Sequence, residues 1–476
     1  MVISAITDGI SRQIEGAVAQ VSETLFEPVL RLGVTGLSRA GKTVFITALV
    51  ANLLDRGRMP QLTAQAQGRI EAVYLQPQPD LTLPRFDFET HLAALTGDGV
   101  SGEGPRWPQS TRAISELRLS FRVRPGGFFG TMRGPRLLHL DIVDYPGEWL
   151  LDLGLLEKTY AEWSEATLDR IAKRPEAADF MSSVRAEDGA LRLEEARAQH
   201  LAALFTRYLT AARAAGWSDC TPGRFLLPGD LAGSPVLTFA PLPKPALTPR
   251  GSLWREMQRR YEAYKDRVVR PFFRDHFARV DRQIVLVDVL GAIHQGPRAV
   301  EDLRRTMVDV LQAFRPGRNG WLSGILGGKR VERILFAATK ADHLHHSQHP
   351  ALTGIMEAML RDAKSRADFA GAKTAALSLA SLRTTVEETI LRGGESFDSV
   401  KGRLLTSGKS VAMYPGTLPT DPARLLAPAR EGAERWLDAE YGLMEFAPAR
   451  LNLAPGMGPP HIRLDRAAEF LFGDRL

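Results

Sequence analysis

The sequence predicts an α/β fold in which helices cover both faces of a mostly parallel sheet. Three observations indicate this class. A short apolar run at 29–35 leads through a glycine-rich loop into a helical pattern at 42–55. Two more buried strands are expected at 137–144 and 334–338. Amphipathic helical patterns lie between these strands, and alternating strands and helices are typical of parallel sheets, because a helix must carry the chain back to the start of the next strand.

Composition limits the protein class. The chain has 476 residues, of which 44% are hydrophobic, enough for two or three cores. Cys220 is the only cysteine, which excludes an intramolecular disulfide and thiolate metal sites. No run approaches the roughly 20 apolar residues of a membrane span, and the N-terminus lacks the pattern of a secretory signal. The net charge of +6 comes without basic blocks interleaved with aromatics. We therefore expect a cytoplasmic protein that does not bind nucleic acid.

The glycine-rich loop is expected to bind phosphate. Residues 36–43 read GLSRAGKT and match the pattern G-x-x-x-x-G-K-[ST] between a strand and a helix. Backbone N–H groups of such a loop surround a β-phosphate. Lys42 would bridge the β- and γ-phosphates, and the Thr43 hydroxyl would bind Mg²⁺. An ordinary glycine turn is the alternative. The residues expected to contact a nucleotide here are Gly36, Ser38, Arg39, Ala40, Gly41, Lys42, Thr43 and Val44.

A later strand supplies the acidic partner that a nucleotide hydrolase needs. The segment 137–149 reads LLHLDIVDYPGEW and ends in the pattern D-x-x-G. We expect Asp144 to hold Mg²⁺ and the Gly147 N–H to contact the γ-phosphate. Asp141 lies inside the strand and is the less favoured ligand. A plain type I or II turn is the alternative for this segment.

A third strand favours guanine over adenine. The segment 334–344 reads ILFAATKADHL, in which Thr339, Lys340 and Asp342 satisfy [NT]-K-x-D. The Asp342 carboxylate would accept hydrogen bonds from N1–H and the 2-amino group of guanine, a donor pair that adenine lacks. The aliphatic part of Lys340 would lie over the base. In the next expected strand, Ala380 and Ser381 occupy the place where a backbone N–H meets the guanine carbonyl.

A third Mg²⁺ ligand is expected from a switch loop. Thr111 precedes a strand that should border the nucleotide, and a hydroxyl there would complete the magnesium shell when the γ-phosphate is present. Ser110 is the alternative, and a turn residue before a strand is the plainer interpretation. The expected metal ligands are Thr43, Thr111 and Asp144.

The order of these motifs is the order found in Ras-like GTPases. The segments RLGVTGLSRAGKT, LDIVDYPGEWLLDL, DRQIVLVDVLGA, ILFAATKADH and PHIRLDRAAEFLFGDRL resemble the YcjX-like family of bacterial stress-associated GTPases. The similarity runs from about residue 30 to the end of the chain. The resemblance implies a Ras-like P-loop core with helical insertions, GTP or GDP and Mg²⁺ as ligands, hydrolysis of GTP, and a link to stress.

Motif spacing predicts where the core is interrupted. Lys42 and Asp144 are 102 residues apart, and Asp144 and Lys340 are 196 apart, more than a minimal GTPase needs. Three amphipathic helical patterns fall within the longer gap. We expect an N-terminal amphipathic helix at 1–28, a first core part at 29–150 with a surface insertion at about 60–105, a mainly helical insert at 151–280, and a second core part with C-terminal elements at 281–476.

Catalysis is expected to involve Lys42, Arg39, Gly147 and Glu148. Glu148 stands where Ras-like enzymes carry a water-orienting glutamine, and a carboxylate beside the γ-phosphate is repelled. Arg39 could supply the missing positive charge. The loop is similar at this position to those of guanylate-binding proteins and atlastins, in which the arginine acts as an internal finger on dimerisation. A solvated side chain is the plainer alternative for Arg39.

The favoured function is a Mg²⁺-dependent GTPase switch with slow intrinsic hydrolysis. A nucleotide-gated scaffold with negligible hydrolysis is the alternative, and the TKAD motif disfavours an ATP-dependent kinase. A homodimer and an effector at the inner membrane stay open as partners. The segment 317–330 places apolar residues among basic ones, which suits a membrane, a partner or the protein's own core.

Four histidines crowd into DHLHHSQH, at 343, 345, 346 and 349. Their spacing would place pairs on one helix face, as a zinc site requires. No further ligand or general base accompanies them in the sequence. We therefore expect a solvated helix start here.

Overall fold

The computed structural model describes residues 27–37, 39–97, 104–109, 113–126, 134–314, 331–366, 372–436, 440–451 and 453–476. Four expectations fall outside these residues: nearly all of the helix at 1–28, Ser38, the switch threonine Thr111 with its alternative Ser110, and the segment 317–330.

A seven-stranded sheet forms the centre of the molecule, in the order β2-β3-β4-β1-β5-β6-β7. Five neighbouring strands, from β4 to β7, run parallel, while β3 is antiparallel to both β4 and β2. The predicted α/β class is confirmed. The strands are β1 (Val29–Gly36), β2 (Ile70–Gln76), β3 (Ser115–Val123), β4 (Arg136–Asp144), β5 (Arg282–Val287), β6 (Arg333–Ala338) and β7 (Lys373–Ser378).

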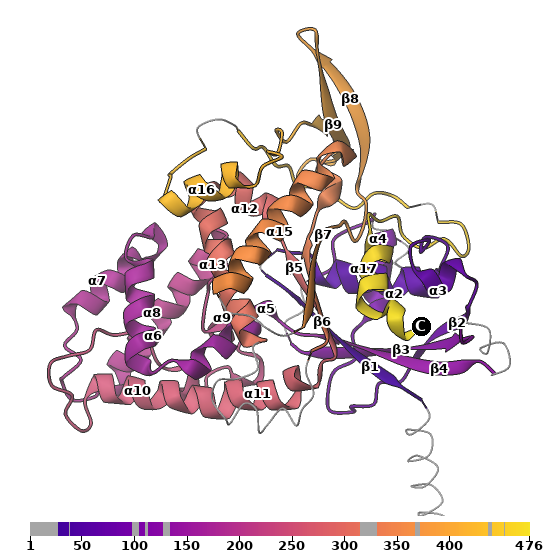
Figure 1. Cartoon of the computed structure of the whole chain (residues 1–476). Coiled ribbons are helices and arrows are strands. Elements are labelled where there is room, and N and C mark those ends of the chain that lie inside the picture. Colours follow the sequence, from indigo (N-terminus) through magenta and orange to yellow (C-terminus); the bar gives the residue numbers. More distant parts are fainter. Residues whose placement is uncertain are drawn as a thin grey trace, which may run out of the picture.

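Helices cover both faces of this sheet (Figure 1). The strands are buried on both sides, so alternate residues of β5 enter two different cores: Ile284 and Leu286 one, Val285 and Val287 the other. The first core also contains α2 (Lys42–Asp55), α3 (Thr63–Ala66), α4 (Phe88–Thr96) and α17 (Leu464–Phe472). The second contains α5 (Gly147–Leu151), α12 (Val289–Gln295), α13 (Pro297–Ala313), α15 (His349–Arg366) and α16 (Ala423–Glu431).

A group of helices lies between β4 and β5 in the chain and beside the sheet in space (Figure 1). Their apolar side chains join the same continuous core as α13 and α15, so the group packs on the body of the protein rather than on a core of its own. Trp163 stacks on Tyr261 at the centre of the group, with ring centroids 5.0 Å apart. The helices are α6 (Tyr160–Ile171), α7 (Ala178–Ala186), α8 (Glu195–Ala214), α9 (Gly223–Leu226), α10 (Leu253–Tyr264) and α11 (Arg270–Asp275), with a 3₁₀ segment at Asp152–Glu157 and a π-helical segment at Lys265–Val269.

Three of these helices coincide with the amphipathic patterns expected within 151–280, and the short α7 was not foreseen. The domain limits themselves stay a prediction. Within the described residues, no helix is long and apolar enough to cross a bilayer.

Two β features were not foreseen from the sequence. The segment expected as a surface insertion contributes β2, which pairs with β3 and forms one edge of the main sheet. A separate antiparallel sheet follows β7 and consists of β8 (Thr385–Arg392), β9 (Glu395–Arg403) and β10 (Ser410–Met413). The β8–β9 hairpin projects from the body (Figure 1). Its turn uses Gly393 and Gly394 at φ 64° and 87°, the left-handed conformation that a tight hairpin turn requires.

Candidate functional site

The predicted motifs converge on one cavity of about 410 Å³ at the carboxyl edge of the parallel strands. This volume lies in the range of small-ligand sites, about 300–1,000 Å³. Every described residue that the sequence assigned to nucleotide contact or catalysis lines it: Gly36, Arg39, Ala40, Gly41, Lys42, Thr43, Val44, Gly147, Glu148, Thr339, Lys340, Asp342, Ala380 and Ser381. The structure thus places these residues together, while their roles stay predictions.

The loop between β1 and α2 depends on residues in the left-handed region. Gly41 precedes α2 at φ 77°, and a Cβ there would meet nothing within 4 Å, so the conformation rather than space favours glycine. Arg39 has φ 61°, which costs a non-glycine residue roughly 1–2 kcal/mol. The N–H of Leu37 donates to the carbonyl of Leu286 at 3.0 Å and joins the loop to β5. The loop is therefore held in a strained shape that aims α2 at the cavity.

Lys42 and Asp144 form an ion pair beside the cavity. The lysine Nζ lies 2.6 Å from Oδ1 of Asp144 and donates to the Tyr145 carbonyl at 3.1 Å. Asp144 is fully buried. Among the described residues its Oδ2 has no hydrogen-bond partner, which is costly for a carboxylate and suits a cation ligand. The geometry thus brings the predicted phosphate lysine and the predicted metal ligand together.

Asp141 is already paired and is less suited to a metal. Arg118 donates to its two carboxylate oxygens at 2.6 and 2.8 Å, in a bidentate pair between β3 and β4. This arrangement agrees with the preference for Asp144 drawn from the sequence.

Gly147 is required by close packing. A Cβ at this position would lie 2.1 Å from the carbonyl oxygen of Gly36, so any side chain here would clash with that oxygen. The D-x-x-G segment therefore rests directly on the predicted phosphate-binding loop.

Asp342 lies at the opposite end of the cavity and is held in position by Thr384. Its Oδ2 accepts hydrogen bonds from the Thr384 N–H at 2.9 Å and hydroxyl at 2.6 Å. Lys340 has φ 60°, and its Nζ lies 2.5 Å from Oδ2 of Asp288, at the end of β5. The N–H of Thr339 donates to the Val287 carbonyl at 2.9 Å. The two Thr384 bonds fix the carboxylate that the sequence assigned to base recognition, and the other two hold the backbone just before it against the end of β5.

Ala380 and Ser381, one of which was expected to offer a backbone N–H to guanine, differ in whether that N–H is already bonded within the described residues. Ala380 uses its N–H to donate to the carbonyl of Ile462 at 3.1 Å, so that group is engaged within the fold. Ser381 follows it and lines the same cavity. Of the expected pair, Ser381 is thus the better placed to offer an N–H to a ligand.

Sequence reasoning missed several residues that line the cavity near Asp342, among them Trp107, His343, Leu405 and Phe446. Trp107 donates from Nε1 to the Phe446 carbonyl at 2.9 Å, and the rings of His343 and Phe446 pack 5.2 Å apart. Burial lowers the pKa of His343, and within the described residues its Nδ1 has no hydrogen-bond partner. His343 adjoins the TKAD motif and could have been suspected, whereas no local pattern marks the other three.

Sequence reasoning also missed Arg213, which lies on α8 and reaches the cavity beside Glu148. Its Nη2 lies 2.8 Å from Oε1 of Glu148, and the Arg213 and Glu148 side chains are 33% and 12% exposed. Both residues line the cavity. A cation from the helical insertion thus stands next to the residue that follows the D-x-x-G motif.

Further contacts join this segment to the insertion. A Cβ on Gly223 would lie 2.4 Å from the Glu148 carbonyl oxygen, and the Gly223 N–H donates to Oδ1 of Asp152 at 2.8 Å. The Tyr264 hydroxyl donates to Oδ2 of Asp152 at 2.5 Å. Complete burial raises the pKa of Asp152 to about 7. The guanidinium of Arg224 lies 3.3 Å from the centroid of the Trp149 ring.

The chain is similar to known proteins over nearly its whole length. The sequence model of the YcjX-like family, DUF463, matches residues 30–476. The chain belongs to the YcjX-like family. It is 37% identical over 461 residues to the Ras-like GTPase YcjX of Escherichia coli (strain K12), covering 94% of this chain and 96% of that protein. It is 34% identical over 473 residues to the Ras-like GTPase YcjX of Shewanella oneidensis (strain MR-1), covering 94% of each. The resemblance noted in the sequence is confirmed.

Proposed function

We propose that this protein is a GTPase that binds GTP with Mg²⁺ and hydrolyses it to GDP and phosphate as a molecular switch. Its YcjX-like relatives, which are named Ras-like GTPases, support a GTPase-type function and guanine nucleotide binding. The observation that carries the proposal is the meeting of Lys42, Gly147 and Asp342 in one cavity, although these residues come from three distant parts of the chain.

Base recognition rests on Asp342. Its carboxylate accepts from N1–H and the 2-amino group of guanine, and adenine would leave it with an unmet acceptor. Thr384 holds the carboxylate in one orientation, which reduces the entropy lost on binding. Ser381 offers an N–H toward the guanine carbonyl.

Phosphate binding rests on the loop amides and Lys42. In this structure the Lys42 ammonium pairs with the Asp144 carboxylate at 2.6 Å. When the nucleotide binds, the ammonium turns to the β- and γ-phosphates, which replace the carboxylate as its partner. Thr43, Asp144 and Thr111 would hold Mg²⁺, which would neutralise charge on the phosphates. The buried carboxylate of Asp144 fits this role, because a cation would satisfy its oxygens.

Hydrolysis proceeds by in-line attack of water on the γ-phosphorus, with cleavage of the bond to the bridging oxygen. Lys42, the loop amides and the Gly147 N–H stabilise the charge that develops. Arg39 acts as an internal arginine finger, and Glu148 stands at the position of the water-orienting residue. The Arg213 guanidinium neutralises Glu148 and so lowers its repulsion of the γ-phosphate.

The switch acts through the segment 147–152. Gly147 rests on the phosphate-binding loop, while Glu148, Trp149 and Asp152 contact residues of α8, α9 and α10. A shift of this segment between the GTP and GDP states therefore reaches the insertion without an intervening linker.

The biological setting belongs to the same proposal. We place the protein in the cytoplasm on the basis of its composition, and we link it to a stress response on the basis of the family that its motifs resemble. A peripheral position at the inner membrane, an effector protein and a homodimer are the partners to be tested. The alternative function is a nucleotide-gated scaffold that holds GTP or GDP with negligible hydrolysis.

Single-turnover release of phosphate, with protein in excess over nucleotide, tests the proposal. We expect slow release from GTP with Mg²⁺, none from ATP, and none after chelation of the metal. Tight binding of GTP without release above the protein-free rate would instead favour the scaffold.

Lys42→Ala is the negative control, and its thermal unfolding must be measured as well. The substitution leaves Asp144 as a buried, unpaired charge, a change that costs roughly 3–5 kcal/mol. Loss of activity is informative only if the variant is folded at the assay temperature.

A further inference from the structure

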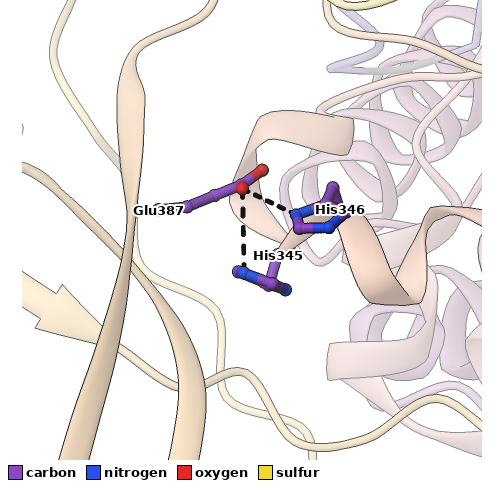
Figure 2. Close-up of side chains that lie close together, drawn as sticks. All are labelled: His345, His346 and Glu387. Atoms are coloured by element: carbon purple, nitrogen blue, oxygen red, sulfur yellow. Dashed lines mark hydrogen bonds and ion pairs between the residues drawn. The ribbon is translucent and has the colours of Figure 1, made fainter.

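Two adjacent histidines and a glutamate from a distant strand face one another on the surface (Figure 2). His345 and His346 lie just before α15, in the loop that follows Asp342, and Glu387 lies on β8. The sequence alone favoured a solvated helix start here because it offered no further ligand. The structure supplies that ligand from 41 residues beyond His346.

The three side chains point ligand atoms at one spot. Oε2 of Glu387 lies 2.7 Å from Nδ1 of His346 and 3.7 Å from Nε2 of His345. All three ligand atoms lie within 4.8 Å of one another, and the two imidazole rings are 4.3 Å apart, centroid to centroid. A zinc ion with bonds of about 2.0–2.2 Å to nitrogen and oxygen fits among atoms so spaced after small side-chain shifts.

The other ring nitrogen of His345, Nδ1, contacts Ser347 and Asp398. Its Nδ1 lies 2.8 Å from the Ser347 hydroxyl and 3.3 Å from Oδ2 of Asp398, on β9. The Ser347 hydroxyl in turn donates to the same Asp398 oxygen at 3.2 Å. A carboxylate behind a histidine fixes the ring and raises its basicity, which is the usual arrangement around a metal-binding histidine. His345 is thus oriented with Nε2 toward Glu387.

Burial and the neighbouring charges act on the pKa of Glu387 in opposite directions. Burial opposes ionisation, but the His346 hydrogen bond, the charges of both histidines and Arg383 together hold the pKa of Glu387 below its ordinary value. Arg383 lies 3.6 Å from the other carboxylate oxygen, Oε1, and leaves Oε2 facing the histidines. Oε2 is therefore the carboxylate oxygen positioned to meet a metal together with the two histidines.

We propose that His345 Nε2, His346 Nδ1 and Glu387 Oε2 bind one zinc ion, with water completing a tetrahedral shell. Two imidazoles with one carboxylate suit zinc, whereas Mg²⁺ and Ca²⁺ prefer oxygen ligands throughout. This site is separate from the Mg²⁺ proposed beside the phosphates, and it does not depend on the proposed GTPase activity.

Zinc at this position would fasten the projecting β8–β9 hairpin to the base-reading loop. The hairpin base already meets that loop, because the hydroxyl of Thr385 donates to the backbone carbonyl of Asp342. His345 lies three residues beyond Asp342. Metal binding would therefore stiffen the hairpin base and the guanine end of the cavity together.

Calorimetric titration of zinc into the tag-free, full-length chain, without nucleotide, tests the site. We expect one equivalent to bind to the wild type, and hydrogen exchange at the base of the β8–β9 hairpin to slow. Co²⁺ in place of zinc should give an absorption band of a tetrahedral nitrogen and oxygen shell. Glu387→Gln and His346→Ala should each abolish stoichiometric binding, and Asp398→Asn should weaken it about 10- to 100-fold.

His200→Ala, which removes an exposed histidine on α8, is the matched control and should bind zinc like the wild type. Asp342→Asn should also keep zinc binding, so failure of the nucleotide assignment cannot be mistaken for failure of this one. Circular dichroism checks that each variant is folded. Less than one equivalent in the wild type, or unchanged binding in Glu387→Gln, would show that the histidines only pair with the glutamate and would overturn the proposal.

Discussion

Arg213→Ala tests whether the helical insertion takes part in hydrolysis. The substitution removes the only partner that the structure shows for the Glu148 carboxylate among the described residues. Under the proposed function, an uncompensated negative charge would then stand beside the γ-phosphate. We expect the rate of GTP hydrolysis to fall while nucleotide affinity changes less.

The size of the effect follows from the exposure of the pair. Hydrogen bonds to charged groups are worth roughly 1.5–3 kcal/mol, and exposed ion pairs about 0–1 kcal/mol. The 2.8 Å contact joins a 33% exposed arginine to a 12% exposed glutamate, so the lower end of the first range applies. If the whole of this energy is lost in the transition state, about 1.5 kcal/mol corresponds to a rate change of about tenfold.

A double-variant cycle separates two roles for Arg213. If the arginine acts by neutralising Glu148, the loss should vanish in a Glu148→Gln background, because no carboxylate is left to neutralise. The assay is single-turnover phosphate release, with GTP and GDP affinities measured separately. Arg207→Ala, an exposed arginine on the same helix, is the control and should hydrolyse GTP at the wild-type rate.

Two results would refute this reasoning. An unchanged rate in Arg213→Ala would make the pair purely structural. A tenfold loss that persists with glutamine at 148 would mean that Arg213 acts on the phosphates directly, so that neutralisation of Glu148 is the wrong account.

Three further predictions concern other parts of the site. Asp342→Asn should weaken the binding of GTP and strengthen the binding of xanthosine triphosphate, because the amide donates a hydrogen bond where the carboxylate accepted one. Unchanged base preference in a competition assay would remove the assignment of Asp342 to base recognition. Arg39→Ala should lower the single-turnover rate at least about tenfold with little change in GDP affinity, since a fully engaged finger is worth roughly 10³–10⁵; a loss explained wholly by weaker GTP binding would leave Arg39 a surface residue. Asp152 has a pKa of about 7 in the folded chain, against an ordinary value of 3.8, so the folded chain binds its proton more tightly than the unfolded chain does. The protonated carboxyl therefore stabilises the fold fully below about pH 4, and this contribution is lost as the pH rises to 7. Denaturant unfolding of Asp152→Asn should show a flatter stability profile across that window, and an identical profile in both chains would contradict the raised pKa.

The parts of the site that lie next to β-strands were predictable from the sequence. Lys42, Asp144 and Asp342 each follow or end an apolar strand within a short motif, and parallel strands bring their carboxyl ends to one edge of the sheet. The register of the strands, with Val34 opposite Asp144 and Ala338 opposite Ser378, produces this meeting. The α/β class followed from the same pattern.

The residues that the sequence did not reveal come from long-range packing. Arg213 sits in an ordinary amphipathic helix, and only the fold of the insertion brings it to Glu148. Phe446 follows a stretch without regular secondary structure and meets His343 about a hundred residues away in the chain. Strand β2 was missed because IEAVYLQ is only half-buried at the sheet edge, where apolar patterning is weak. No periodicity or motif encodes such contacts.

The segment 147–152 links the chemistry to the rest of the molecule. Gly147 packs directly against the Gly36 carbonyl, and both carboxylate oxygens of Asp152 accept hydrogen bonds, one from Gly223 of α9 and one from Tyr264 of α10. Between them, Glu148 faces the cavity and is held by a helix of the insertion. The insertion shares one continuous core with α13 and α15, so it cannot shift as a loosely tethered body. A change at the γ-phosphate that displaced this segment would have to repack that core or break the Arg213–Glu148 pair. The pair is partly exposed and worth about 1.5 kcal/mol, so it is the contact that would break first.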